Sequence, residues 1–141
     1  MKQIAVVYWS GTGNTEAMAL EVVKGIEKVG ANASIFTASA FQEDLVKAYD
    51  AIAFGCPSMG AEQLEEGEFE PMFEACLPVL KGKNIALFGS YGWGDGEWMD
   101  EWKSTCEQAG AQLVCESVIC NEYPDDVALV ACHELGASLA Q

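Results

Sequence analysis

The chain has 141 residues, which suits one domain spanning 1–141 that buries about two-thirds of the surface exposed by its unfolded form. It carries 22 Asp and Glu against 7 Lys and Arg, a formal net charge of -15, so its field repels polyanions. This charge argues against nucleic acid and anionic membrane surfaces as partners and favours proteins with basic surfaces.

The predicted elements alternate between short apolar strands and amphipathic helices. In chain order, we expect a strand at 3–8, a helix from Thr15 to Gly30, a strand at 33–36, a weaker helix at 41–48, a strand at 51–55, a helix at 69–80, a strand at 84–89, a helix at 97–109, a strand at 112–119 and a helix from about 125 to 139. The strands lack polar alternation, as strands buried on both faces do. In the last helix we expect Val127, Val130 and Leu135 to face the sheet.

This alternation predicts an α/β fold, a doubly wound five-stranded parallel sheet with helices on both faces and right-handed crossovers. Loops rich in glycine and polar residues follow three of the strands: SGTGNT after the first, CPSMGAE after the third and SYGWGDG after the fourth. Ligands of such sheets bind at the carboxyl ends of the strands. The three loops therefore predict one shared site.

The six cysteines are expected to be free thiols, mostly buried. No charged and apolar leader precedes them, and none forms a C-x-x-C motif. The only histidine, His133, directly follows Cys132, so no zinc-type spacing is present. The longest apolar runs are far below the ~20 residues of a membrane span. We expect a cytoplasmic protein without a metal and without membrane insertion.

The first loop has the composition of an anion site. Gly11 and Gly13 bring backbone N–H groups and a helix N-terminus to one point, and Ser10, Thr12, Asn14 and Thr15 add neutral donors. An ATP-type P-loop requires a G-K-[ST] sequence, which is absent here. The dinucleotide motif G-x-G-x-x-G is also incomplete, because Glu16 occupies the position of its third glycine. The loop therefore suits one terminal monophosphate rather than a triphosphate with magnesium.

Three segments carry a resemblance to a known family. YWSGTGNTEAM, GCPSMGAEQLEE and LFGSYGWGDGEWM resemble the phosphate loop and the two isoalloxazine-flanking loops of the flavodoxins, specifically the short-chain type of anaerobic bacteria. The likeness covers essentially the whole chain. It implies strand order 2-1-3-4-5, tightly bound FMN, and a monomeric low-potential one-electron carrier. Such a carrier exchanges electrons with ferredoxin-type donors and acceptors that have basic docking surfaces.

The resemblance also implies the cofactor-binding residues. Trp93, flanked by two glycines, and Met59 would cover the two faces of the flavin ring, and Glu62 would accept a hydrogen bond from flavin N3–H. Trp98 and Trp102, spaced i, i+4 on a helix, are expected to pack in the core. The full predicted set is Trp9, Ser10, Gly11, Thr12, Gly13, Asn14, Thr15, Ser58, Met59, Gly60, Ala61, Glu62, Ser90, Tyr91, Gly92, Trp93, Asn121 and Glu122.

Two positions depart from the family pattern. Pro57 lacks an N–H where relatives can offer a serine, and Ala61 follows Gly60 where many relatives carry Asp, Asn or Gly. The resemblance implies that the Gly60–Ala61 carbonyl swings to accept flavin N5–H, which stabilises the neutral semiquinone. The surrounding carboxylates would disfavour the anionic hydroquinone and lower the second potential. The chain would then shuttle mainly between semiquinone and hydroquinone.

Two other functions remain open at this point. An FMN-dependent NAD(P)H or quinone reductase on the same fold needs a second pocket over the flavin, which Trp93 would obstruct. A receiver-type regulatory module needs a cluster of aspartates after the first strand and a lysine in the last loop; Tyr8-Trp9-Ser10 and Asn121-Glu122 supply neither. We expect an electron-transfer protein rather than an enzyme.

Overall fold

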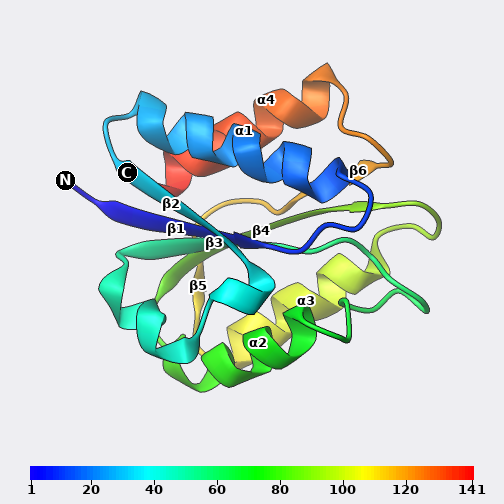
Figure 1. Ribbon diagram of the computed structural model, residues 1–141, viewed down its shortest axis with the longest axis horizontal. Coiled ribbons are helices and arrows are strands. Elements are labelled where there is room, and N and C mark those ends of the chain that lie inside the picture. Colours follow the sequence, from blue (N-terminus) through cyan, green and yellow to red (C-terminus); the bar gives the residue numbers. More distant parts are fainter.

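A six-stranded parallel sheet runs through the centre of the molecule, as seen in the computed structural model, which describes residues 1–141 (Figure 1). The strands are β1 (Gln3–Tyr8), β2 (Asn32–Thr37), β3 (Ala51–Gly55), β4 (Asn84–Tyr91), β5 (Gln112–Leu113) and β6 (Val118–Asn121). Their order is β2-β1-β3-β4-β5, and β6 also pairs with β4. The predicted order 2-1-3-4-5 is confirmed.

Four α-helices cover the two faces of the sheet. They are α1 (Asn14–Lys28), α2 (Phe69–Cys76), α3 (Glu97–Gln108) and α4 (Asp126–Leu139). Helices α1 and α4 lie on one face and α2 and α3 on the other (Figure 1). Short 3₁₀ turns at Ala38–Ala40, Glu43–Ala48 and Leu77–Val79 complete the structure, so the weakly predicted helix at 41–48 is a 3₁₀ turn.

Each face of the sheet has its own core. Phe54, Phe73 and Trp102 belong to the cluster under α2 and α3, and Ile4 and Met18 belong to the cluster under α1 and α4. Every residue of β3 is buried, which explains why the sequence of this central strand shows no polar alternation. Trp98 and Trp102 are both buried in the core, as predicted.

The last predicted strand, 112–119, is divided into β5 and β6. Between the pairs Ile85–Leu113 and Phe88–Val118, β4 advances three residues (85 to 88) while its partner advances five (113 to 118). The two extra residues cannot join the ladder, so the segment bulges before pairing resumes. The expected five strands are therefore six, without a change in strand order.

Helix α4 presents a different face to the sheet than the sequence suggested. Val127 and Val130 are 78% and 57% exposed, whereas Leu135 is buried as expected. A Cβ added at Gly136 would lie 2.2 Å from the Val22 carbonyl oxygen of α1. Backbone contact this close is possible only where α4 presents a glycine to α1, so the face that carries Gly136 is buried and Val127 and Val130 lie on the outer side of the helix.

All six cysteines are free thiols. None of the helices combines the length and the apolar character needed to cross a membrane.

Candidate flavin-type site at the carboxyl edge of the sheet

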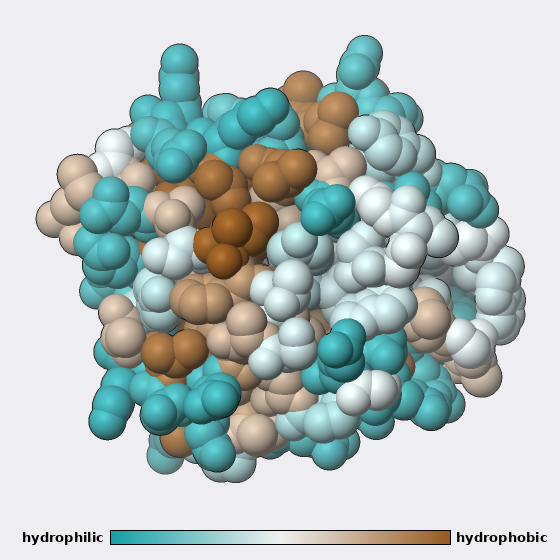
Figure 2. All heavy atoms as spheres, in the orientation of Figure 1, coloured by the Kyte–Doolittle hydropathy of each residue, from teal (hydrophilic) through white to brown (hydrophobic).

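The loops after β1, β3 and β4 lie together at one end of the sheet (Figure 1). In the space-filling view the right-hand end of the molecule is pale, because residues of intermediate hydropathy gather there, while strongly apolar surface lies further left (Figure 2). This end carries the three predicted site loops. The topology therefore brings the three segments together, as the strand order requires.

The first loop ends in a glycine that begins helix α1. Gly13 is the N-cap with φ of 96°, a left-handed conformation that a Cβ would disfavour. Its N–H donates to the Ser10 hydroxyl over 3.1 Å, which closes the loop. The side chain of Ser10 thus supports the loop's own backbone.

Most backbone N–H groups of this loop and the first turn of α1 have no acceptor in the protein, and four of them surround Gly13. These four belong to Gly11, Thr12, Asn14 and Thr15. The first N–H groups of a helix cannot bond within it, and together with the helix dipole they favour an anion. No lysine or arginine lies in 9–15, so the N–H groups and hydroxyls alone would hold the charge.

Two hydroxyls lie beneath this loop. Thr15 and Ser90 are 1% and 4% exposed, and their Oγ1 and Oγ atoms are 3.3 Å apart. Ser90 comes from β4, so this pair joins the phosphate loop to the fourth strand. Buried hydroxyls require partners, and each of these has further hydrogen-bonding capacity.

A cavity of about 420 Å³ extends from the first loop between the other two. It is lined by Trp9, Gly11, Thr12, Asn14, Pro57, Ser58, Met59, Ser90, Tyr91, Gly92 and Glu122. All of these except Pro57 belong to the set predicted from the sequence, and Pro57 was noted there as a departure.

The loop after β3 is a tight hairpin at its tip. Met59 N–H donates to the Gln63 carbonyl over 2.7 Å, and Gln63 N–H donates to the Met59 carbonyl over 2.8 Å. Between them Gly60 and Glu62 have positive φ values of 52° and 55°, and Ala61 does not. The Gly60–Ala61 peptide therefore lies at the tip of a hydrogen-bonded turn.

Glu65 closes the same segment on itself. Its carboxylate accepts hydrogen bonds from the N–H groups of Gly67, Glu68 and Phe69 over 2.7, 2.7 and 2.8 Å. Its own N–H donates to the Cys56 sulfur over 3.4 Å. Desolvation raises the pKa of Glu65, but the three N–H groups outweigh it and hold that pKa below its usual value.

Two aromatic residues at the end of β1 are held by glutamates. The Trp9 indole N–H donates to Glu68 over 2.9 Å, and the Tyr8 hydroxyl donates to Glu16 over 2.9 Å. Burial raises the pKa of Tyr8, and the hydrogen bond and charge of Glu16 raise it further. These contacts border a second, polar cavity of about 340 Å³ on the first loop.

Two large apolar side chains of the predicted site are open to solvent. Trp93 is 62% exposed and Met59 is 38% exposed. Exposed surface of this kind, on loops at the edge of a cavity, is available to cover a flat ligand. Of the four tryptophans, Trp93 is thus exposed, Trp98 and Trp102 are buried, and Trp9 is half-buried.

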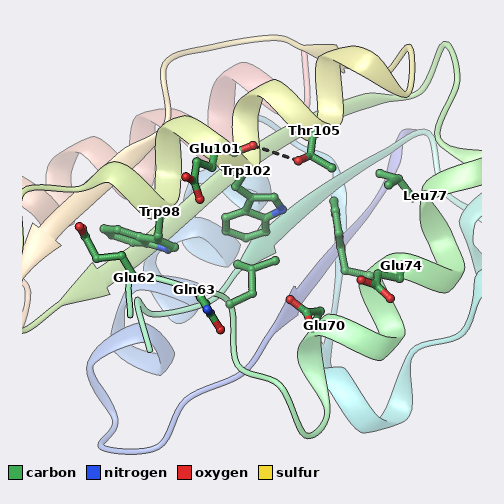
Figure 3. Close-up of a pocket in the computed structure, with 11 residues that line it drawn as sticks. Glu62, Gln63, Glu70, Glu74, Leu77, Trp98, Glu101, Trp102 and Thr105 are labelled. Atoms are coloured by element: carbon green, nitrogen blue, oxygen red, sulfur yellow. Dashed lines mark hydrogen bonds between the residues drawn. The ribbon is translucent and has the colours of Figure 1, made fainter. Parts of the chain in front are cut away.

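Glu62 belongs to an acidic cluster rather than to the cavity wall. Single oxygens of Glu62, Asp95 and Glu97 lie within 4.8 Å of one another, and Glu62 accepts from Glu97 N–H over 3.2 Å. Asp95 raises the pKa of the exposed Glu97, and Glu62 adds to this effect. Figure 3 shows Glu62 beside Trp98 at one end of a separate pocket between α2 and α3, with Glu70 and Glu74 projecting from α2 opposite Trp102.

The end of β6 contributes one residue to the cavity and one beside it. Glu122 lines the cavity and has φ of 61°, and its N–H donates to the Tyr91 carbonyl over 2.8 Å. The Asn121 amide donates to the same carbonyl over 3.2 Å. Asn121 therefore supports the turn and does not line the cavity.

The remaining predicted residues surround the cavity without lining it. Ser10 and Gly13 shape the first loop, Thr15 lies under it, and Gly60, Ala61, Glu62 and Trp93 are at the tips of the other loops. The sequence analysis missed Glu65 and Glu68, which organise the segment after β3. No motif in the sequence distinguishes these two from the neighbouring glutamates.

Comparison with known proteins gives a consistent set of matches. A family model described as flavodoxin matches residues 6–136. The flavodoxin of Megasphaera elsdenii is 46% identical over 138 residues, which cover 98% of both chains. The flavodoxin of Clostridium beijerinckii is 42% identical over 135 residues, which cover 96% of this chain and 97% of that one. The solution structure of two-electron reduced M. elsdenii flavodoxin superposes with a TM-score of 0.90 at 47% identity, covering 97% of this chain and 98% of that one.

Proposed function

This chain belongs to the flavodoxin family, and we propose on that premise that it works mainly between the semiquinone and the hydroquinone of its flavin. Flavodoxins bind FMN and carry electrons, so the chain is an FMN-binding electron carrier and not an enzyme with its own substrate. FMN, when bound, supplies the one-electron redox chemistry. The protein supplies the position of the cofactor and the charge around it.

The residues of the structure fit this cofactor. The observation that carries FMN binding is the set of unpaired N–H groups at Gly11, Thr12, Asn14 and Thr15, which suits a terminal monophosphate. The cavity of about 420 Å³ leads from these N–H groups to the loops that carry Met59 and Trp93. One polar end and one apolar end in a single cavity suit a phosphorylated chain attached to an aromatic ring.

The charge around the site supports a low potential for the second electron. Glu62, Asp95 and Glu97 crowd their carboxylates together at the tips of the two ring loops. The only ion pair joins Lys24 and Glu21, both of which lie on helix α1. Adding an electron beside uncompensated carboxylates is unfavourable, more so at low ionic strength.

The loop after β3 supports separation of the two electron steps. The Gly60–Ala61 peptide lies at the tip of the Met59–Gln63 hairpin, and Gly60 tolerates both signs of φ. We propose that this carbonyl turns to accept a hydrogen bond from a newly protonated ring nitrogen. Because the hairpin is closed by Met59 and Gln63, the change stays within the turn.

We further propose that partners with basic surfaces dock at the acidic rim of this edge and that the carrier acts as a monomer in the cytoplasm. The net charge of -15 supports steering of basic partners. The reductase alternative has no support from the flavodoxin relatives.

The test is to purify the protein and reduce it stepwise under anaerobic conditions. We expect a yellow protein with one FMN per chain, and a blue intermediate on partial reduction. A colourless protein that takes up no FMN in titration would refute cofactor binding. Direct reduction from the yellow to the colourless form, without the blue intermediate, would refute the proposed separation of the two steps.

A further inference from the structure

The segment from Cys56 to Phe69 forms a closed lobe that is held at its base by Glu65. The N–H of Glu65 donates to the Cys56 sulfur at the start of the segment, and its carboxylate caps three N–H groups at the start of α2. The residues between these ends include Met59 and Gly60, the tip of the ring loop. The position of the tip thus depends on the base.

Glu68 connects this base to the first loop. The N–H of Glu68 is one of the three groups bound by the Glu65 carboxylate, and its side chain accepts from the Trp9 indole N–H over 2.9 Å. The Trp9 ring in turn lies on Gly11: a Cβ added to Gly11 would be 3.0 Å from the ring. A continuous set of contacts therefore runs from Glu65 through Glu68 and Trp9 to the phosphate loop.

We propose that Glu65 and Glu68 form a clasp that couples the phosphate-binding half of the FMN site to its ring-binding half. Glu65 is the positioning residue for the ring loop, and Glu68 is the positioning residue for Trp9. Neither side chain lines the main cavity, so both act through the residues that they hold. This inference rests on FMN as the ligand and assigns a role to two residues outside the predicted cofactor set.

If Glu68 acted only through its charge, removing it would change FMN affinity in the opposite direction to loss of the clasp. Glu68 is a negative charge beside a loop that binds a phosphate, so its removal alone should strengthen FMN binding. Loss of the clasp should weaken it, because Trp9 would no longer be held against the loop. The sign of the change therefore separates the two roles.

The first experiment titrates wild-type, Glu68→Ala and Glu68→Gln apoproteins with FMN and with riboflavin, which lacks the phosphate. Glu68→Ala should bind FMN roughly tenfold more weakly, which is the effect of losing one hydrogen bond to a charged group. It should bind riboflavin almost as well as wild type does. Glu68→Gln retains an acceptor oxygen for Trp9 and should bind FMN at least as well as wild type. Glu74→Ala removes the same charge from an exposed position on α2 and is the matched control.

Two results would overturn the role of Glu68. One is unchanged or tighter FMN binding by Glu68→Ala, and the other is an equal loss for FMN and riboflavin. A Trp9→Phe variant, which removes the donor but keeps a ring, gives an independent check. In a double-mutant cycle Glu68→Ala should have little further effect in the Trp9→Phe background, and full additivity would contradict the clasp.

The second experiment tests Glu65 by the same titrations. Glu65→Ala should weaken riboflavin binding, because the ring loop loses its base, whereas Glu68→Ala should leave riboflavin binding almost normal. Glu65→Ala should weaken FMN binding at least as much, because the contacts that lead to the first loop also start at Glu65. If Glu65→Ala does not fold, Glu65→Gln, which keeps one acceptor oxygen, should show the same losses to a smaller extent. Normal riboflavin binding by a folded Glu65 variant would refute its positioning role. Failure of the wild-type protein to bind FMN would instead refute the proposed function.

Discussion

The hydroxyl of Thr15, in the first turn of α1, lies 3.3 Å from the hydroxyl of Ser90 in β4, and both side chains are buried. This contact joins the start of α1, just after the first site loop, to the strand that carries the third site loop. Because each hydroxyl is the other's side-chain partner, removing one leaves the other without a partner in the buried interior.

We therefore predict that Ser90→Ala lowers the free energy of unfolding of the apoprotein by about 1 to 3 kcal/mol, the cost of a buried unpaired polar group. Urea denaturation of the apoprotein measures the change. Ser138→Ala, at an exposed position of α4, is the control and should shift the midpoint little. A Ser90→Ala apoprotein as stable as wild type would mean that the pair contributes nothing in solution.

Trp93 should contribute to cofactor affinity through its exposed ring. It is 62% exposed in the protein, so a stacked ligand would cover it without moving core residues. Trp93→Ala should weaken FMN binding by about 1 to 3 kcal/mol, the range for stacking of a base on an aromatic side chain, or roughly 5- to 150-fold. Quenching of flavin fluorescence on titration measures the affinity. Apoprotein stability should not change, and a drop in it would show a packing role instead.

Ala61 tests the proposed movement of the turn. Ala61 has negative φ in this structure, and a type II turn with Gly60 and Ala61 at its centre needs positive φ at Ala61. A Cβ there costs ~1 to 2 kcal/mol, so Ala61→Gly should raise the first reduction potential by roughly 40 to 85 mV. The second potential should move much less, because the turn is already formed. Redox titration decides this, and equal shifts in both potentials would contradict the movement.

The capping bonds of Glu65 predict a pH dependence of stability. Its pKa in the folded protein is below its usual value, so its contribution is present above the unfolded pKa, near 4.3, and is lost as pH falls through the lower folded value. Unfolding of wild type and Glu65→Gln should therefore differ by a constant amount from pH 7 to about pH 5, and the difference should shrink below about pH 4. A difference that stays constant down to pH 2.5 would contradict the assignment.

Electron transfer to a basic partner should be steered by charge. The net charge of -15 and the carboxylates at the site loops attract such a partner over distances that salt screens. Second-order rate constants measured by stopped flow should fall as ionic strength rises from low to physiological values. Rates that stay flat or rise would show that docking does not depend on the acidic rim.

Local patterns predicted most of the elements and the three site loops. The bounds of β1 and β3 match the prediction because both are central strands with unbroken apolar runs, from Ile4 to Tyr8 and from Ala51 to Gly55. The last strand was predicted as one strand at 112–119 because hydrophobicity does not show how a strand is aligned with its neighbour. The bulge between Leu113 and Val118 appears only when the strand is paired with β4. Val127 and Val130 were misplaced for a related reason: the close approach of α1 and α4 at Gly136 decides which face of α4 is buried, and hydrophobicity alone does not show it.

By itself the sequence determined the α/β class and showed that no cation lies in the first loop, because these depend on periodicity and on residue types that are adjacent in the chain. The strand order followed from the family resemblance. Only the tertiary structure decided which polar side chains meet. The pairs Thr15–Ser90 and Trp9–Glu68 join residues 75 and 59 positions apart. Ser90 was predicted near the site but not as a partner of Thr15, and Glu68 was not predicted at all. A hydrogen bond depends on the distance between two atoms in space, and that distance is set by the packing of the strands and helices that carry them.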